Sequence, residues 1–395
     1  MTESPSVLHF LWSGEIGGAE RAVYQLVREQ RRRGTRAGVV FGRAVGFYAD
    51  ALRGLGCPVF SLDATGAGDL RALGSARRVV GGWDVHHFHI VEPLMFAGST
   101  RAGSSTRVFT QRAGVQSGES FKKQLRRRVA KRQLQRRFHG WCGNTDYARS
   151  TLSQVYGIPA SLIDVVRNGV EIDLLRPQRN SEEVRRSLGV GMDDFVVGVT
   201  ASLKPWKRLH LLMQAAARLD GKHLAVVIVG DGPDRPRLEG VAKQLGIEQA
   251  VRFTGMQERV EDLVSAMDAF VLPSSKVETF GNSVVEAMVL GIPSVIFDDS
   301  PGLGEHIVSG RTGFVVKDVP ELTHTLQTLR DDPNLRAGIG KAGAEYAAKT
   351  YGIERTADGY EGCYRKAMVR GKSGDGVSAA LAREELSRGT QTPNA

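Results

Sequence analysis

Short apolar segments alternate with longer stretches of helical periodicity along the whole chain. In the first half, the expected strands are residues 7–11, 37–41, 85–89, 108–110, 141–142 and 162–166. In the second half, they are residues 195–199, 224–229, 251–253, 269–272, 294–297 and 314–316. These segments are apolar on both faces, which is typical of parallel strands covered by helices on both sides. The pattern therefore predicts an α/β protein with two doubly wound, Rossmann-like domains.

The length of 395 residues fits two domains of ordinary size. A polar stretch separates the two sets of strands, so we expect a first domain at 1–168, a linker at 169–190 and a second domain at 191–350. We expect residues 351–370 to form a helix that packs back on the first domain. The tail at 371–395 is rich in glycine, serine and charge. We expect it to be mostly disordered, with a weak helix at 378–388.

Two glutamates eight positions apart, Glu278 and Glu286, are the most informative polar residues. Glu278 lies in the loop after the strand 269–272. Glu286 lies about one turn inside a helix that we expect to begin near Asn282 or Ser283. The carboxyl ends of parallel strands meet at the edge where open α/β sheets bind ligands. The helix start between the two glutamates suits a phosphate, and the carboxylates suit hydroxyls of a sugar or ribose attached to that phosphate.

A structural interpretation of the same residues stays open. The sequence Ser283-Val284-Val285-Glu286 also has the spacing of a capping box, which stabilises a helix start without any ligand. That interpretation leaves Glu278 and the turn at Phe280-Gly281 unexplained.

Four other turns follow predicted strands and could meet the same ligand. Gly17-Gly18 lies at a predicted helix start, where backbone amides can approach a diphosphate closely. Lys207, in the turn after residues 195–199, can neutralise a diphosphate leaving group. Gly232 closes the strand 224–229 with a tight turn, and residues 251–255 could seat a nucleobase. Ordinary turns use the same residue types, so each signal alone is weak.

Histidines mark the end of the strand 85–89. His87 and His89 share one face of the strand, and either could line a reacting sugar. Metal binding is the rival interpretation, but the sequence offers no third nearby ligand of firm spacing, so we expect no metal. A hydrogen-bonded structural histidine is the third possibility.

Composition narrows the class of protein. Hydrophobic residues make up 41% of the chain and charged residues 24%, as in soluble globular proteins. No apolar run reaches the roughly 18 residues of a spanning helix, and the first residues do not resemble a secretion signal. Cys57, Cys142 and Cys363 are too sparse for a disulfide framework or a zinc site. We therefore expect a cytoplasmic protein, which could lie at the inner face of the membrane.

The net charge of +10 is concentrated in one segment, residues 121–139, which holds nine Lys/Arg and no acid. Phe121, Leu125 and Val129 recur there at a spacing of four, which predicts an amphipathic helix. Such a helix could contact an anionic membrane, bind nucleic acid, or form a solvated face.

The order of these motifs resembles the family 4 retaining glycosyltransferases, which have the GT-B fold. The resemblance covers roughly residues 7–365 and is stronger in the second half, through Val-Gly-Asp-Gly-Pro at 229–233, the Glu-x7-Glu pair and Glu-Ala-Met at 286–288. It implies two Rossmann-like domains with an interdomain cleft. It also implies a metal-independent enzyme that moves a sugar, with retention, from a nucleotide-diphosphate sugar of UDP or GDP type to a hydroxyl acceptor.

The resemblance also implies roles for individual residues. Catalytic roles fall on His89, Lys207 and Glu278. The implied donor-binding residues are Gly17, Gly18, Lys207, Gly232, Phe280, Gly281, Asn282, Ser283 and Glu286. One departure is that Ser202 stands where family members often have a second phosphate-binding arginine. Either Lys204 or Arg208 substitutes for it, or the stabilisation of the phosphate is weaker.

Several questions stay open from the sequence. The acceptor could be a lipid-linked or cell-surface glycan precursor or a small metabolite. Alternative functions are a GT-B-fold nucleotide-sugar epimerase or hydrolase, and a non-catalytic basic protein that binds nucleic acid or membrane.

Overall fold

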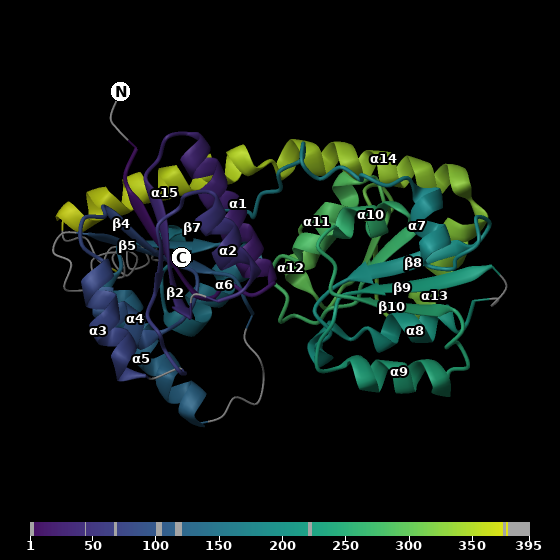
Figure 1. Cartoon of the computed structure of the whole chain (residues 1–395), viewed down its shortest axis with the longest axis horizontal. Coiled ribbons are helices and arrows are strands. Elements are labelled where there is room, and N and C mark those ends of the chain that lie inside the picture. Colours follow the sequence, from purple (N-terminus) through teal and green to yellow (C-terminus); the bar gives the residue numbers. More distant parts are fainter. Residues whose placement is uncertain are drawn as a thin grey trace, which may run out of the picture. The chain divides into compact units, whose positions relative to one another are not determined.

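The computed structural model describes residues 4–373 and 377, apart from 44, 67–68, 100–104, 115–120 and 220–222. The expected weak helix at 378–388 lies outside these residues. Contacts divide the chain into two compact units, one formed by residues up to 169 together with those from 353 onward, and one formed by residues 170–352. In each unit, helices cover both faces of a single sheet (Figure 1).

The first unit contains a seven-stranded parallel sheet with the order β3-β2-β1-β4-β5-β6-β7. Its strands are β1 (Val7–Ser13), β2 (Ala37–Arg43), β3 (Val59–Ser61), β4 (Val85–Phe88), β5 (Thr106–Gln111), β6 (Gly140–Gly143) and β7 (Ile163–Val165). Its helices are α1 (Gly18–Arg32), α2 (Phe47–Gly54), α3 (Leu70–Val79), α4 (Pro93–Gly98), α5 (Phe121–Arg137), α6 (Asp146–Tyr156), the short 3₁₀ helix η2 (Ala160–Leu162) and α15 (Ile353–Ser373).

The second unit contains a six-stranded parallel sheet with the order β10-β9-β8-β11-β12-β13. Its strands are β8 (Phe195–Thr200), β9 (Leu224–Val229), β10 (Val251–Gly255), β11 (Ala269–Leu272), β12 (Ser294–Phe297) and β13 (Phe314–Val316). Its helices are α7 (Ser181–Ser187), the 3₁₀ turn η3 (Pro205–Lys207), α8 (His210–Ala216), α9 (Arg235–Gln244), α10 (Val260–Ser265), α11 (Asn282–Val289), α12 (Pro301–Gly304), α13 (Val319–Asp331) and α14 (Pro333–Thr350).

Local sequence explains where several helices begin and end. Thr145 caps α6 by accepting a hydrogen bond from the backbone N–H of Ala148, and Gly157 ends this helix with φ 64°. Asp318 caps α13 in the same way through Glu321. Helix α6 contacts β5, β6 and β7, and α13 contacts β13 and the helices α8 and α14.

All twelve expected strands are present, and the prediction of two doubly wound sheets is confirmed. Strand β3, at the sheet edge, was missed because its three residues are only half-buried and carry little hydrophobic pattern. Residues 170–190, expected as part of a linker, belong to the second unit. They contain α7, and Val170, Val184 and Val190 are buried in the core of that unit.

Helix α15 belongs to the first unit, where it contacts α1, β5 and β6 (Figure 1). Its buried side includes Tyr360, Cys363 and Tyr364. The chain therefore returns to complete the core of the unit in which it began.

Both sheets have a topological switch point, where consecutive crossovers leave in opposite directions. In the first unit it lies between β1 and β4, and in the second between β8 and β11. Ligands of open α/β sheets bind beyond the carboxyl ends of the strands at such points. The predicted site residues follow these four strands, except Gly232, which follows β9.

Candidate active site

Lys207 lies in the turn after β8, at the end of η3. Its side chain is only 10% exposed and forms an ion pair with Glu278 Oε2. The ammonium group also lies over the Trp206 ring, 4.6 Å from its centroid. A buried lysine needs such partners to stay charged, so this cation is held in place rather than solvated.

The loop after β11 is fastened to the same turn. The backbone N–H of Ser275 donates to Trp206 O at 3.0 Å, and that of Glu278 donates to Ser275 O at 3.0 Å. These bonds join the turn after β8 to the loop that carries Glu278. The structure therefore brings together Lys207 and Glu278, which are 71 residues apart in the chain.

Helix α11 begins beside this ion pair. Its N-cap is Gly281, with φ 66°, which has no side chain with which to cap the helix. Asn282 and Ser283 are its first two residues, so Ser283 is not at the N-cap and the capping-box interpretation is wrong. Glu286 lies one turn into the helix and is buried, with 5% exposure. This helix start has the geometry that suits an anion, with a carboxylate on either side of it.

Phe280 is part of the core behind the site and is 2% exposed. Its carbonyl oxygen accepts a hydrogen bond from His306 Nε2 at 2.6 Å, and His306 Nδ1 contacts the Tyr351 hydroxyl at 2.7 Å. The ring of Phe280 also packs edge-on against His306. This brace orients the turn before α11. Sequence reasoning missed it, because the histidine carries no motif that links it to Phe280.

Gly232 lies where the turns after β8 and β9 approach each other. A Cβ at this position would lie 2.5 Å from Leu203 O, and the N–H of Leu203 donates to Asp231 O at 2.9 Å. Only glycine allows the backbones of the two turns to approach this closely. This structural requirement is separate from the predicted contact of Gly232 with the ligand.

Arg208 and Lys204 differ in their availability to a phosphate. Arg208 forms two bonds of 2.6 Å to the carboxylate of Asp299 and donates to the backbone oxygens of Pro273 and Ser274 at 2.8 and 3.0 Å. It therefore fastens three loops and is fully engaged. Lys204 and Ser202 are exposed, so Lys204 is the better placed of the two to supply a second positive charge.

In the first unit, Gly17 is the N-cap of α1 and Gly18 its first residue. The carboxylate of Glu20 lies so close to Gly17 that a Cβ there would overlap with it. As a glycine, Gly17 has no side chain with which to cap this helix. Because α1 begins shortly after the end of β1, its first backbone amides can make the diphosphate contact predicted from the glycine pair.

His89 follows β4 and is buried, with 4% exposure. Arg112 Nε donates to His89 Nδ1 at 3.0 Å, so the ring proton of this neutral histidine is on Nε2. That nitrogen lies 3.0 Å from His9 Nδ1, and His9 Nε2 lies 2.9 Å from Gln30 Oε1. Each group thus donates a hydrogen bond to the next, from Arg112 through His89 and His9 to Gln30. Both ring nitrogens of His89 are therefore hydrogen-bonded within the protein.

His87 belongs to the same polar network. Its ring nitrogens contact the Tyr364 and Thr110 hydroxyls at 2.8 and 2.7 Å, and Arg112 also donates to the Tyr360 hydroxyl at 3.0 Å. The two tyrosines belong to α15, so the network fastens this helix to β4 and β5.

Burial keeps these histidines neutral. It lowers the pKa of His9 to about 4 and holds those of His87 and His89 well below the usual range, an effect to which Arg112 adds.

His9 is the third histidine that the sequence did not connect to the other two. It lies on β1 directly opposite His87 on β4, and the ligand atoms of His9, His87 and His89 lie within 4.8 Å of one another. Each ring nitrogen already has a protein partner, and the Arg112 bond requires a proton on His89 Nε2. Metal binding would require this hydrogen-bond arrangement to be replaced, because a ligating nitrogen must be unprotonated.

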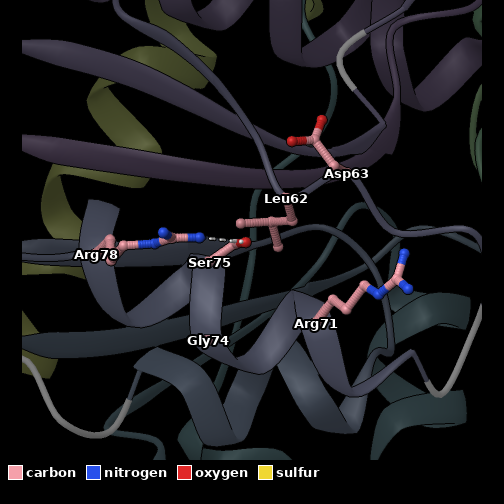
Figure 2. Close-up of a pocket in the computed structure, with 6 residues that line it drawn as sticks. All are labelled: Leu62, Asp63, Arg71, Gly74, Ser75 and Arg78. Atoms are coloured by element: carbon pink, nitrogen blue, oxygen red, sulfur yellow. Dashed lines mark hydrogen bonds between the residues drawn. The ribbon is translucent and has the colours of Figure 1, made fainter.

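A separate hollow of about 610 Å³ lies between the end of β3 and α3, lined by Leu62, Asp63, Arg71, Gly74, Ser75 and Arg78. Figure 2 shows that the two arginines do not converge, since Arg78 reaches Ser75 while Arg71 points away from it. None of the predicted site residues lines this hollow.

Two parallel-sheet Rossmann-like domains, with candidate residues at their switch points, define a protein of the GT-B class. Residues 17–169 match the family model of the glycosyl transferase 4-like domain, and residues 180–346 match that of the glycosyl transferases group 1. Together the two matches cover most of the chain, which is similar to these two glycosyltransferase families.

Curated relatives include two D-inositol 3-phosphate glycosyltransferases. That of Rhodococcus erythropolis is 34% identical over 60% of this chain and 55% of its own length. That of Gordonia bronchialis is 28% identical over 90% of this chain and 85% of its own. The chain thus spans little more than half the length of the first relative.

Solved structures share the fold. HepE of Anabaena, in complex with UDP and glucose, has a TM-score of 0.80 at 24% identity and covers 90% of this chain and 97% of its own. Sucrose-phosphate synthase of Thermosynechococcus elongatus has a TM-score of 0.75 at 18% identity, covering 92% and 99%. Among the described residues, no helix is long and apolar enough to cross a membrane.

Proposed function

We propose that the protein transfers a sugar from a nucleotide-diphosphate sugar to a hydroxyl acceptor, with retention at the anomeric carbon and without a metal. The observation that carries this proposal is the Lys207–Glu278 ion pair at the start of α11, with Glu286 buried one turn further on. A cation, a helix start and two carboxylates within one loop cluster are suited to a diphosphate that carries a sugar on one side and a ribose on the other.

The ion pair suggests how the donor is accommodated. The diphosphate would replace Glu278 as the partner of Lys207, and Glu278 would then accept hydrogen bonds from hydroxyls of the transferred sugar. Glu286 would hold the ribose hydroxyls, and the turn from Phe280 to Ser283 would hold sugar and phosphate. As the sugar leaves, Lys207 and the helix start stabilise the charge that develops on the diphosphate.

The acceptor proton would pass to the leaving phosphate on the same face of the sugar. In the first unit, the amides of Gly17 and Gly18 would contact the diphosphate. Because both nitrogens of His89 are engaged within the protein, we assign it to the wall of the acceptor side and not to proton transfer. Gly232 supports the turn that faces the donor.

The comparisons indicate which substrates to test first. HepE is in complex with UDP-glucose in one of its structures, which makes UDP-hexoses the first donors. The relatives named D-inositol 3-phosphate glycosyltransferases make an inositol phosphate the first acceptor. The group 1 match does not favour the epimerase, hydrolase or non-catalytic alternatives.

Donor binding can be tested by thermal shift against UDP, GDP and their sugars. At a concentration of about 100 times Kd, a nucleotide ligand adds about 2.7 kcal/mol to the free energy of unfolding and raises Tm. We expect Lys207→Ala to abolish most of this shift, because the diphosphate loses its buried cation. Lys243→Ala is the control, because it removes an exposed lysine of α9 in the same unit, away from the predicted site residues, and we expect it to keep the wild-type shift.

Activity is measured with donor and acceptor together and with donor alone. We expect Lys207→Ala and Glu286→Ala each to lower kcat/KM by about 100-fold or more, with unchanged circular dichroism. Product formation should persist in EDTA, and nuclear magnetic resonance should show the donor's anomeric configuration in the product. Full turnover by either variant, or sugar release that needs no acceptor, would contradict the proposal.

A further inference from the structure

Helix α5 presents an apolar stripe to solvent. Phe121, Leu125 and Val129 are 76%, 52% and 44% exposed, whereas Ala130 and Leu134 are fully buried. The spacing of four places the three exposed residues on one side of the helix, roughly opposite the buried pair. The stripe therefore faces away from the body of the first unit. Apolar side chains grouped in this way on a folded surface mark an interaction site.

Cations surround this stripe. The exposed cations of α5 are Lys122, Lys123, Arg128, Lys131, Arg132, Arg136 and Arg137. Within the part of the chain that the structure describes, none of these seven forms an ion pair with an acid. The helix itself contains no acidic residue. Its outward face thus combines apolar surface with a dense and uncompensated positive charge.

The inner side of α5 is firmly attached. Arg126 donates to the buried Glu92 at 2.6 Å, and Gln133 donates to Pro93 O at 3.2 Å. The Trp141 indole N–H donates to Leu134 O at 3.2 Å. The position of the outward face is therefore set by the fold. Glu92 and Pro93 also place this helix beside the loop that follows β4, which carries His89.

We propose that the outward face of α5 docks on an anionic lipid bilayer, with Phe121, Leu125 and Val129 entering the interfacial layer and the surrounding cations contacting lipid phosphates. A nucleic-acid backbone would satisfy the cations, but it offers no apolar environment to leucine and valine. A bilayer surface satisfies both sets of side chains. This inference rests on the surface alone and is independent of the proposed sugar transfer.

The test is co-sedimentation of the full chain with vesicles, without donor or acceptor. We expect binding to vesicles of phosphatidylcholine with about one-third phosphatidylglycerol, little binding to pure phosphatidylcholine, and release at high salt. Arg128→Gln with Arg132→Gln should weaken binding by about 25-fold, since each cation near the surface contributes about fivefold. Phe121→Gln with Leu125→Gln should weaken it by about tenfold.

Matched variants control for general loss of charge or apolar surface. Arg71→Gln with Arg77→Gln removes two exposed arginines of α3, and Leu70→Gln with Val369→Gln removes two exposed apolar side chains elsewhere. Both should bind as wild type does. A Phe121→Trp variant should show a blue shift of its emission with anionic vesicles only. Absence of vesicle binding, equal loss in the control variants, or binding to oligonucleotides that is indifferent to Phe121→Gln with Leu125→Gln would overturn the proposal.

Discussion

At the scale of single residues, Gly281 decides how α11 begins. Its φ of 66° is a left-handed conformation that other residues adopt only with strain. A Cβ on Gly281 would overlap with Leu303 Cδ2 and approach Leu272 Cδ2 to 3.2 Å. Glycine is therefore required at this position for two reasons: the left-handed backbone conformation and the lack of space for a Cβ.

Replacement of this glycine can separate the two requirements. Gly281→Ala should lower the free energy of unfolding by about 2–3 kcal/mol, from left-handed strain and overpacking together. Gly246→Ala is the matched control, because Gly246 has φ 67° but open space around its Cβ position. It should cost only about 1 kcal/mol. Urea unfolding measures both, and equal losses would show that the packing against Leu303 does not matter.

Residue types at strand ends could be predicted from sequence, but their partners could not. Lys207 and Glu278 each stood out because they follow an apolar strand. Their ion pair depends on β8 and β11 being neighbours, which a linear pattern does not show. In the same way, the sequence placed His87 and His89 on one face of a predicted strand, whereas His9 joins them only through the register of β1 against β4.

At the scale of elements, Arg208 joins the loops after three neighbouring strands. It leaves the turn after β8 and binds backbone oxygens after β11 and the carboxylate of Asp299 after β12. Because Lys207 precedes it directly, the same contacts hold the lysine in position. The sequence predicted Arg208 only as a possible phosphate ligand. The structure gives it a positioning role, which depends on the planar fork of a guanidinium.

Arg208→Lys tests this role, since lysine keeps the charge but cannot reproduce the forked contacts. We expect the KM for the donor to rise by about tenfold, from the loss of roughly 1.4 kcal/mol of orientation. The free energy of unfolding should change much less, because Asp299 is half-exposed and its ion pair is screened. Arg237→Lys is the control, since Arg237 forms a similar two-bond pair with Asp234 on α9. An unchanged donor KM in Arg208→Lys would refute the positioning role.

At the scale of the whole molecule, the two units do not correspond to an N-terminal half and a C-terminal half of the chain. The second unit is continuous, whereas the first is closed by α15 from the far end of the sequence. The polar network of Arg112, His9, His87 and the two tyrosines of α15 is central to that closure. Sequence periodicity predicted the helix but not this network, because Tyr360 and Tyr364 have the same spacing as ordinary core residues.

The network also predicts acid sensitivity of the first unit. In the unfolded chain, histidines bind protons as pH falls below about 6.5, whereas the folded chain keeps His9 neutral until about pH 4. Because the unfolded state then binds more protons than the folded state, the free energy of unfolding decreases as pH falls from about 6.5 to about 4. Above this range the histidine is neutral in both states and does not change the free energy of unfolding. The same direction holds for His87 and His89, whose pKa values burial also lowers.

Denaturant unfolding at pH 7.5 and pH 5 measures this effect. His9 should lower the free energy of unfolding by about 2 kcal/mol between these two conditions, where most carboxylates stay ionised. His9→Gln should be less stable than wild type at pH 7.5 but should lose about 2 kcal/mol less on acidification, because it has one titrating group fewer. His324→Gln, at an exposed position of α13, should keep the wild-type pH dependence. If His9→Gln and wild type lose the same stability between the two pH values, His9 is not held neutral by its burial.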